Sequence, residues 1–417
     1  MTKMTLSEEL QWRGFVNQTT FEDITELDSE KRTFYWGVDP SAASMTIGNL
    51  AAAMMVRSFI KHGYKPVLLV GGATGLIGDP DGKAQERDLK TPEIVAKNKA
   101  GLVSQYKTIF AGQDFKVVDN YDWFKDMNYL EFLREVGKHV PMRQMLARDF
   151  VQSRLGEDGA GISYAEFSYS LIQGYDFLHL FEKHGVTMQM SGADQWGNCI
   201  AGVDLIRRKT GKTAHIWTVP LIVNKSTGVK FGKSEEGAVW LDPELTSPTQ
   251  FYQFWINLDD EGVEDYLKVY TELDKEAIDK VMHHHKEAPQ QRTAQTVLAQ
   301  EVTKLVHGEK DMQQAEAVTA YLIGKEDIAT AGAAALAIIR KEQPSAHTNP
   351  TGSIVDSLVS TGLATSNTEA RRLIGGNAIS INNQKVNREV FEASDFHGGR
   401  LLIRKGKRFK DSALIEI

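Results

Sequence analysis

The sequence predicts an α/β protein: a doubly wound, Rossmann-like parallel-sheet domain, then an all-helical domain, then a small C-terminal α+β domain. Three observations predict this order. From about residue 32 to 224, short runs rich in Val, Ile, Tyr and Phe alternate with helical patterns, which is typical of a parallel sheet flanked by helices. Beyond Ser247 apolar residues recur at helical spacing. Residues 352–417 carry ten Lys or Arg against seven Asp or Glu, a net charge of +3 in a chain of −7.

Length and composition limit the class of protein. With 417 residues, 41% of them hydrophobic and 25% charged, the chain is long enough for two to four domains. No basic stretch followed by an apolar run opens it, and no window approaches the roughly 18 apolar residues of a membrane span, so we expect a cytoplasmic protein. The single cysteine, Cys199, indicates neither an internal disulfide nor a zinc cluster. We expect no structural metal.

The predicted elements follow in order. Within residues 1–224, strands are expected near Thr33–Val38, Pro66–Val70, Val186–Met190 and His215–Val223, with a largely helical insert over about 91–161. Residues 225–246 form a loop and connector, and 247–324 a helical domain with helices near Pro248–Leu258, Val263–Thr271 and Ala288–His307. The run His283-His284-His285 is expected to be a solvated helix end, because neighbouring helical residues point about 100° apart and share one ion poorly. An Ala-rich stretch indicates a linker over 325–351, before the last domain, 352–417.

Ligands of an open parallel sheet bind beyond the carboxyl ends of its strands, and four unusual clusters lie there. The first, Tyr35 to Pro40, leads through Thr46-Ile47-Gly48-Asn49 into a helix that should run to about His62. A helix start with outward N–H groups suits an anion, although a capped helix after a turn is the alternative interpretation. The second cluster, Gly71 to Pro80, lets backbone approach a ligand, and its Asp79 can accept from an ammonium group. It is neither a P-loop nor a dinucleotide fingerprint.

The third cluster is a helix that begins near Ser163 and Glu166, which stand at capping-box spacing. It carries Tyr169, Gln173 and Asp176 on one face of an otherwise apolar helix, which indicates a pocket; a stripe facing solvent is the alternative.

The fourth cluster joins Asp194 to Asn198 with the loop Lys230-Phe231-Gly232-Lys233-Ser234. Two lysines around Phe-Gly can clamp phosphate charge, although loop lysines are usually only solvated. The conjunction of four clusters at strand ends favours a functional site.

Together these segments resemble those of tyrosyl-tRNA synthetases, which belong to the first structural class of aminoacyl-tRNA synthetases, and the resemblance covers essentially the whole chain. It implies that tyrosine is activated with ATP and then attached to its transfer RNA. It implies that Tyr35 and Asp176 bind the phenolic hydroxyl, that Asp79, Tyr169 and Gln173 bind the ammonium group, and that Gln195 contacts the substrate. The ATP site implied by the resemblance comprises Gly37, Asp39, Ser41, Gly48, Asp194, Lys230 and Lys233, with Mg²⁺. The catalytic residues implied are Thr46, Asn49, Lys83, Arg87, Lys230 and Lys233.

The C-terminal residues resemble a small RNA-binding fold shared with a ribosomal small-subunit protein. The resemblance implies phosphate contacts by Arg371, Arg372, Lys385, Arg404, Lys405, Lys407 and Arg408. It also implies a homodimer, with contacts in the 91–161 insert.

The chain departs from the family pattern near ATP. Thr46 and Asn49 stand where the His-Ile-Gly-His signature has histidines, Ser41 stands for a threonine, and Trp36 stands for a small residue near the ribose. Two alternatives therefore stay open. One is a noncatalytic, synthetase-like RNA-binding protein whose ATP site has decayed, and the other is an adenylating enzyme for tryptophan or a tyrosine-like acid.

Overall fold

The computed structural model describes residues 4–80, 88–156, 159, 161–229, 231–234, 237–406 and 411–417, with the side chains of 149, 150, 233 and 234 left out. The chain forms two compact units. The first comprises Met1–Ser247 and Phe254–Val306, and the second comprises Pro248–Gln253 and His307–Ile417. Among the described residues, no helix is both long and apolar enough to cross a membrane.

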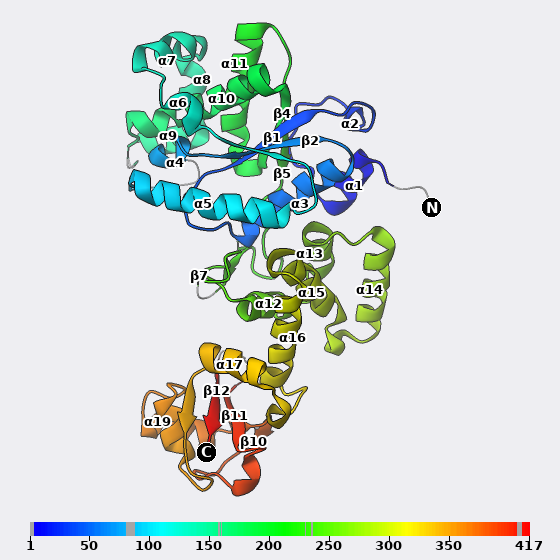
Figure 1. The fold of residues 1–417 in the computed structure, drawn as a ribbon, viewed down its shortest axis with the longest axis vertical. Helices are drawn as coiled ribbons and strands as arrows, with labels where there is room; N and C mark the ends of the chain where they lie inside the picture. Colours follow the sequence, from blue (N-terminus) through cyan, green and yellow to red (C-terminus); the bar gives the residue numbers. More distant parts are fainter. Residues whose placement is uncertain are drawn as a thin grey trace. The chain divides into compact units, whose positions relative to one another are not determined.

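A five-stranded parallel sheet forms the centre of the first unit (Figure 1). Its strands are β1 (Thr33–Val38), β2 (Lys65–Val70), β3 (Lys116–Asp119), β4 (Val186–Gly192) and β5 (His215–Val219). They lie in the order β3-β2-β1-β4-β5, and every neighbouring pair is parallel. The doubly wound fold class is therefore confirmed. The order reverses between β1 and β4, which is where such sheets bind ligands.

One predicted strand limit is wrong, and one strand of the sheet was not predicted, because it lies in the stretch predicted to be largely helical. The fifth strand ends at Val219 instead of Val223, because Pro220 follows and has no N–H to donate to a neighbouring strand. The stretch predicted as a helical insert also supplies a strand, β3, which has only four residues and lies at the sheet edge. A run this short gives little alternating pattern.

Helices cover both faces of the sheet (Figure 1). One face packs against α3 (Ile47–Lys61) and α5 (Pro92–Ile109), and the other against α10 (Tyr164–His184) and α11 (Trp196–Thr210). Side chains of β1 alternate between the faces. Trp36 packs on Tyr106 of α5, with ring centroids 5.6 Å apart, whereas Tyr35 packs on Phe177 of α10 at 5.3 Å. Tyr35 therefore lies on the α10 side of the sheet.

The remaining helices of this unit are short or lie toward residue 306. They are α1 (Leu6–Arg13), α2 (Glu26–Ser29), α4 (Thr74–Ile77), α6 (Tyr121–Phe124), α7 (Tyr129–Glu135), α8 (Met142–Leu146), α9 (Asp149–Leu155), α13 (Val263–Tyr270), α14 (Lys275–Glu287) and α15 (Thr293–His307). A two-stranded ribbon joins β6 (Lys233–Ser234) to β7 (Gly237–Ala238), and α12 spans Pro248–Ile256.

The histidine run lies on α14 and is only partly a solvated surface. His283 and His284 are exposed, but His285 is buried, with its Nε2 atom 3.3 Å from a carboxylate oxygen of Asp260. The expectation of a solvated helix end is thus wrong for His285, because this side of α14 faces its neighbours.

In the second unit, α16 (Glu309–Ile323) and α17 (Ala333–Glu342) precede a mixed sheet in the order β10-β9-β11-β12-β8. Its strands are β8 (Ser345–His347), β9 (Ile379–Ile381), β10 (Gln384–Lys385), β11 (Arg400–Lys405) and β12 (Ser412–Glu416). Two helices, α18 (Ile354–Ser360) and α19 (Asn367–Gly375), share a core with the inward residues Leu401 and Ile403 of β11. Leu402 instead packs with α16 and α17.

Candidate active site

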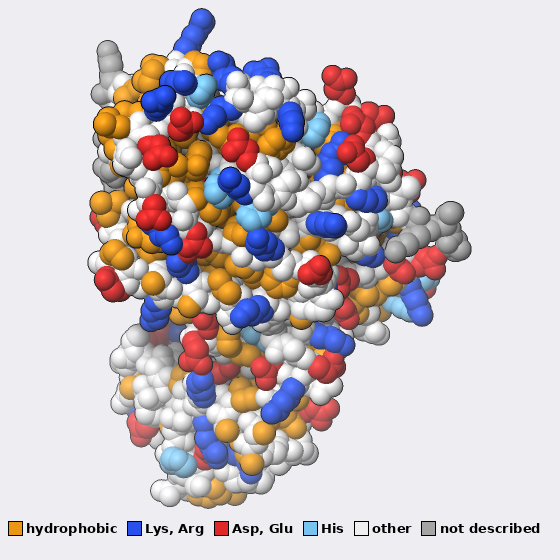
Figure 2. All heavy atoms as spheres, turned by 45° about the horizontal axis from the view of Figure 1, so that its top comes forward, with side chains coloured by type: hydrophobic (Ala, Val, Ile, Leu, Met, Phe, Trp, Pro, Cys, Tyr) orange, Lys and Arg blue, Asp and Glu red, His pale blue; other side chains and the backbone are white. Residues whose placement is uncertain are grey.

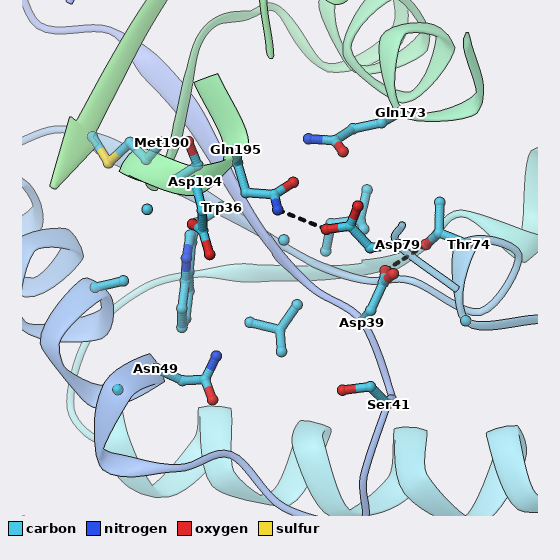
Figure 3. A pocket seen from close by; sticks show the side chains of 18 of the residues that line it. Trp36, Asp39, Ser41, Asn49, Thr74, Asp79, Gln173, Met190, Asp194 and Gln195 are labelled. Carbon is cyan, nitrogen blue, oxygen red and sulfur yellow. Dashed lines mark hydrogen bonds between the residues drawn. The ribbon is translucent and has the colours of Figure 1, made fainter. Parts of the chain in front are cut away.

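A cavity of about 400 Å³ lies beyond the carboxyl ends of β1 and β4 (Figure 3). Its walls come from β1 and the loop after it, the start of α3, the glycine-rich loop, α10 and the end of β4. Thirteen of the predicted tyrosine-binding, ATP-binding and catalytic residues line it: Tyr35, Gly37, Asp39, Ser41, Thr46, Gly48, Asn49, Asp79, Tyr169, Gln173, Asp176, Asp194 and Gln195. The structure therefore brings together clusters that are up to 160 residues apart in sequence.

The polar face of α10 points into this cavity. Ser163 caps the helix by accepting from the Glu166 N–H, while the Glu166 carboxylate pairs with Arg154 at 2.7 Å. Tyr169 and Asp176 are buried and line the cavity with Gln173. The alternative of a solvent-facing stripe is wrong. Buried polar groups on an apolar helix make a recognition surface for a polar ligand.

Two residues that the sequence did not indicate hold Asp176 in place. Asn120 Nδ2 donates to one carboxylate oxygen at 3.1 Å, and Trp123 Nε1 donates to the other at 2.9 Å. Burial raises the pKa of Asp176 well above its usual range, and these two hydrogen bonds oppose that rise. The carboxylate is therefore oriented before any ligand arrives.

Tyr35 and Gln173 each have a buried polar atom to which no described residue hydrogen-bonds. The Tyr35 hydroxyl oxygen and Gln173 Oε1 are buried, and neither has a hydrogen-bond partner in the described part of the chain. Burial also raises the pKa of Tyr35 well above its ordinary value, so it stays a neutral donor. Because buried polar atoms are rarely left unsatisfied, both are suited to contact a polar ligand.

Hydrogen bonds tie the glycine-rich loop to β1 and α10. Asp39 accepts from Thr74 Oγ1 at 2.6 Å and from the Tyr169 hydroxyl at 2.7 Å. Gly71 is required here, because a Cβ atom at this position would lie 2.0 Å from Asp39 Oδ1. On the opposite wall, Gln195 Nε2 donates to Asp79 Oδ2 at 2.6 Å (Figure 3).

The start of α3 forms another part of the wall. The Thr46 backbone N–H and hydroxyl both donate to Asn49 Oδ1, at 3.0 and 3.1 Å. Asn49 therefore keeps its amide N–H groups for other partners. Trp36, at 3% exposure, packs on Tyr106 of α5 and on Phe110, which directly follows this helix, so much of its ring is accommodated in the core.

The lysine loop is anchored beside this helix start. Phe231 is buried and stacks on Tyr266, with ring centroids 4.5 Å apart. A Cβ atom on Gly232, whose φ is +93°, would lie 2.8 Å from the Ile47 side chain. The two signature segments are therefore neighbours. Lys83, Arg87 and Lys230 lie outside the described residues, and Lys233 is described only in its backbone, within β6.

The predicted RNA-binding residues of the second unit differ in accessibility. Arg371, Arg372 and Lys385 are exposed, although Arg371 also pairs with Glu389 at 3.1 Å, whereas Lys405 is partly buried and lies 3.5 Å from Glu369. Arg404 is partly buried, and its guanidinium donates to Asn383 Oδ1 at 2.6 Å. Lys407 and Arg408 lie outside the described residues. No group of three or more metal-ligating side chains occurs in the described part of the chain.

Comparisons with known proteins agree with this geometry. A family model for class I tRNA synthetases (W and Y) matches residues 27–323, and a model for the SYY-like C-terminal domain of tyrosine–tRNA ligase matches residues 336–410. The fold and the first match define the class: the chain belongs to the class I tRNA synthetases of the tryptophan and tyrosine group.

Relatives that match almost the whole chain identify the family within this class. The chain is 45% identical over 416 residues to Tyrosine–tRNA ligase 2 of Bacillus cereus, covering 97% of this chain and 98% of that one. The identity is also 45%, with the same coverage, to the tyrosine–tRNA ligase of Geobacillus stearothermophilus. A C-terminally truncated mitochondrial tyrosyl-tRNA synthetase of Aspergillus nidulans superposes with a TM-score of 0.69 at 29% identity, covering 77% of this chain and 94% of that one. The chain therefore belongs to the tyrosine–tRNA ligase family.

Proposed function

We propose that this cavity activates L-tyrosine with ATP, as tyrosyl-adenylate, and then transfers tyrosine to the 3′-terminal adenosine of its transfer RNA. The observation that carries the proposal is the pair Tyr35 and Asp176, two buried polar groups that line one cavity, of which the first has no partner in the described chain. A phenolic hydroxyl would satisfy both. We further propose that the reaction takes place in the cytoplasm.

The tyrosine end of the cavity would bind both the phenolic hydroxyl and the ammonium group of the amino acid. The phenolic hydroxyl would donate to the fixed Asp176 carboxylate and accept from Tyr35, while Asp79, Tyr169 and Gln173 would hold the ammonium group. Phenylalanine would leave the buried groups unpaired, and this enzyme family is the standard example of such discrimination. The indole of tryptophan would exceed the space allotted to a phenol ring.

The ATP end uses short side chains, backbone and charged groups. Gly37, Ser41 and Gly48 give backbone or small groups to the nucleotide, and Asp194 would accept from the ribose. The tyrosine carboxylate attacks the α-phosphorus, the bond to the bridging oxygen breaks, and pyrophosphate leaves. Charge then builds on the phosphoryl oxygens and the leaving group. Asn49 can donate to it, and Thr46 orients Asn49 by donating to its Oδ1 atom. Lys83, Arg87, Lys230 and Lys233 would neutralise the charge; ATP enters as its Mg²⁺ complex.

The transfer RNA would be held by the rest of the chain. We propose a catalytic domain over 1–224, a loop and connector over 225–246, a helical anticodon-side domain over 247–324, a linker over 325–351 and an RNA-binding domain over 352–417. Exposed Arg372 and Lys385 support phosphate contacts by the last domain. The terminal ribose hydroxyl attacks the tyrosyl carbonyl carbon, and AMP leaves.

A homodimer is supported by an exposed apolar surface on residues 129–164. Large apolar side chains stand 38–75% exposed here: Tyr129, Leu130, Met142, Leu146, Leu155 and Tyr164. Figure 2 turns the top of Figure 1, with α7 and α8, toward the viewer, and hydrophobic side chains are visible among the charged ones. Such patches mark interaction sites. Sedimentation of the full chain should give a dimer, and Leu130→Asp should shift it toward monomer.

The overall function is tested by charging. Full-length protein, ATP, Mg²⁺ and labelled tyrosine should esterify a transcript of tyrosine transfer RNA but not one of phenylalanine transfer RNA. Binding of either transcript without charging would favour the noncatalytic alternative. Charging with tryptophan in preference to tyrosine would favour the second alternative.

A further inference from the structure

The described wall of the cavity is strongly acidic. Among the described residues that line it, Lys90 is the one with a cationic side chain, whereas five have carboxylate side chains: Asp39, Asp79, Asp88, Asp176 and Asp194. ATP brings several further negative charges to this space. A lysine ammonium group on this wall would reduce the repulsion between these carboxylates and the phosphates of ATP.

Lys90 stands where α5 meets the loop that carries Ser41. It precedes α5 by two residues. Asn98 on α5 donates to the Pro40 carbonyl at 3.0 Å, and Gln105 accepts from the Met45 N–H at 2.8 Å. The helix is therefore fastened along the stretch between β1 and α3, and both Lys90, just before the helix, and Ser41, on that stretch, line the cavity.

The ammonium group of Lys90 is available to a ligand. Its side chain is partly buried, and it makes no hydrogen bond or ion pair with the described residues, Asp88 included. Thr46, where the family signature has a histidine, gives only a neutral hydroxyl, and that hydroxyl already donates to Asn49. The start of α3 thus offers the phosphates a weaker donor than the signature does.

We propose that Lys90 is a further ATP-binding residue, whose ammonium group binds the phosphate chain and supplies a charged donor where Thr46 supplies only a neutral one. The inference rests on the proposed ATP site and extends it to a residue that neither the sequence motifs nor the family resemblance assigned. Lys90 would thus add one cation, from the segment before α5, to the proposed Lys83, Arg87, Lys230 and Lys233.

The test varies ATP in tyrosine-dependent ATP–pyrophosphate exchange with the full chain. Lys90→Ala should lower kcat/KM for ATP by roughly 10- to 100-fold, the loss expected for one hydrogen bond to a charged group. Lys90→Arg should retain most activity. Lys97→Ala, which removes an exposed lysine on α5 outside the cavity, should match the wild type. Tyrosine binding without ATP, measured by equilibrium dialysis, should be the same in all four proteins.

A second measurement asks whether Lys90 compensates for Thr46. Introducing Thr46→His should reduce the cost of Lys90→Ala severalfold, because the two groups serve the same phosphates. Equal ATP dependence in Lys90→Ala and Lys97→Ala would overturn the inference while leaving the proposed function intact. Absence of exchange in the wild type would instead contradict the function, and dialysis with labelled ATP would then decide the role of Lys90 alone.

Discussion

The two ends of the cavity are built in opposite ways. At the tyrosine end, Tyr35, Tyr169 and Asp176 are buried on β1 and α10, and the Asp176 carboxylate is held by two hydrogen bonds. At the ATP end, Ser41 and Asp194 are exposed. Selecting one hydroxyl group requires buried hydrogen-bond partners that are oriented in advance. A triphosphate, by contrast, is bound through charged side chains and backbone groups at the exposed edge of the cavity.

Breaking the tyrosine end should have the largest effect. Asp176→Ala removes the acceptor of the phenolic hydroxyl and leaves Asn120 and Trp123 with unpaired donors, a cost of about 3–5 kcal/mol. We expect kcat/KM for tyrosine to fall on the order of 10²- to 10³-fold in pyrophosphate exchange, with the preference over phenylalanine largely lost. Asp204→Ala, which removes a partly buried carboxylate of α11 that pairs with Arg207 outside the cavity, is the control. A variant that keeps its preference for tyrosine would show that the hydroxyl is read elsewhere.

Breaking the ATP end should leave tyrosine binding intact. Lys233→Ala removes a cation that we place at the leaving pyrophosphate, and the loss of one preorganised charge interaction should lower kcat by about 10²-fold. The dissociation constant of tyrosine, measured by dialysis without ATP, should not change. Lys225→Ala, which removes a lysine that pairs with Asp265, serves as the control. Weakened tyrosine binding in Lys233→Ala would show that the two ends of the cavity do not bind their ligands independently.

Trp123 should influence the tyrosine end of the cavity alone, although we assign it no contact with a substrate. Trp123→Phe removes the donor to Asp176 but keeps most of the ring, so the loss of one hydrogen bond to a charged group should raise KM for tyrosine roughly 10-fold. KM for ATP should stay constant, and the ratio of tyrosine to phenylalanine activity should fall. A purely structural role would lower stability and affect both substrates alike.

A buried ion cluster outside the cavity should affect neither end. Burial raises the pKa of Glu9, but hydrogen bonds from His62 and Arg13 outweigh this and bring it to about 2, from the usual 4.5. Its stabilising effect is therefore present above about pH 4.5 and lost as pH falls toward 2. Glu9→Gln should lower the free energy of unfolding by about 1–3 kcal/mol at pH 7, with the difference shrinking below pH 4.5. Urea titrations against the exposed Glu22→Gln would check this, and a pH-independent difference would be the contrary result.

Sequence patterns predicted the regular parts of the site and missed its supports. Helical spacing placed Tyr169, Gln173 and Asp176 on one face, and a single amphipathic helix is enough to determine that. Asn120 and Trp123 follow the short edge strand β3 and reach Asp176 only through the tertiary fold. No local pattern marks such residues.

The lack of a local sequence pattern also explains the errors in the predicted fold. Strand β3 is too short to show alternation, and His285 is buried only because α14 lies against the loop with Asp260. Lys90 belongs to no motif, and it lines the cavity only because the fold brings the segment before α5 beside it. The local sequence pattern is enough to predict that a strand or helix exists. Contacts between residues far apart in the sequence can be identified only from the three-dimensional structure.

The most direct test is pyrophosphate exchange by the wild-type chain with tyrosine, phenylalanine and tryptophan in parallel. The proposed function predicts exchange with tyrosine alone, at a rate that shows Thr46 and Asn49 suffice in place of the signature histidines. Exchange with none of the three, in folded protein that binds transfer RNA, would contradict it.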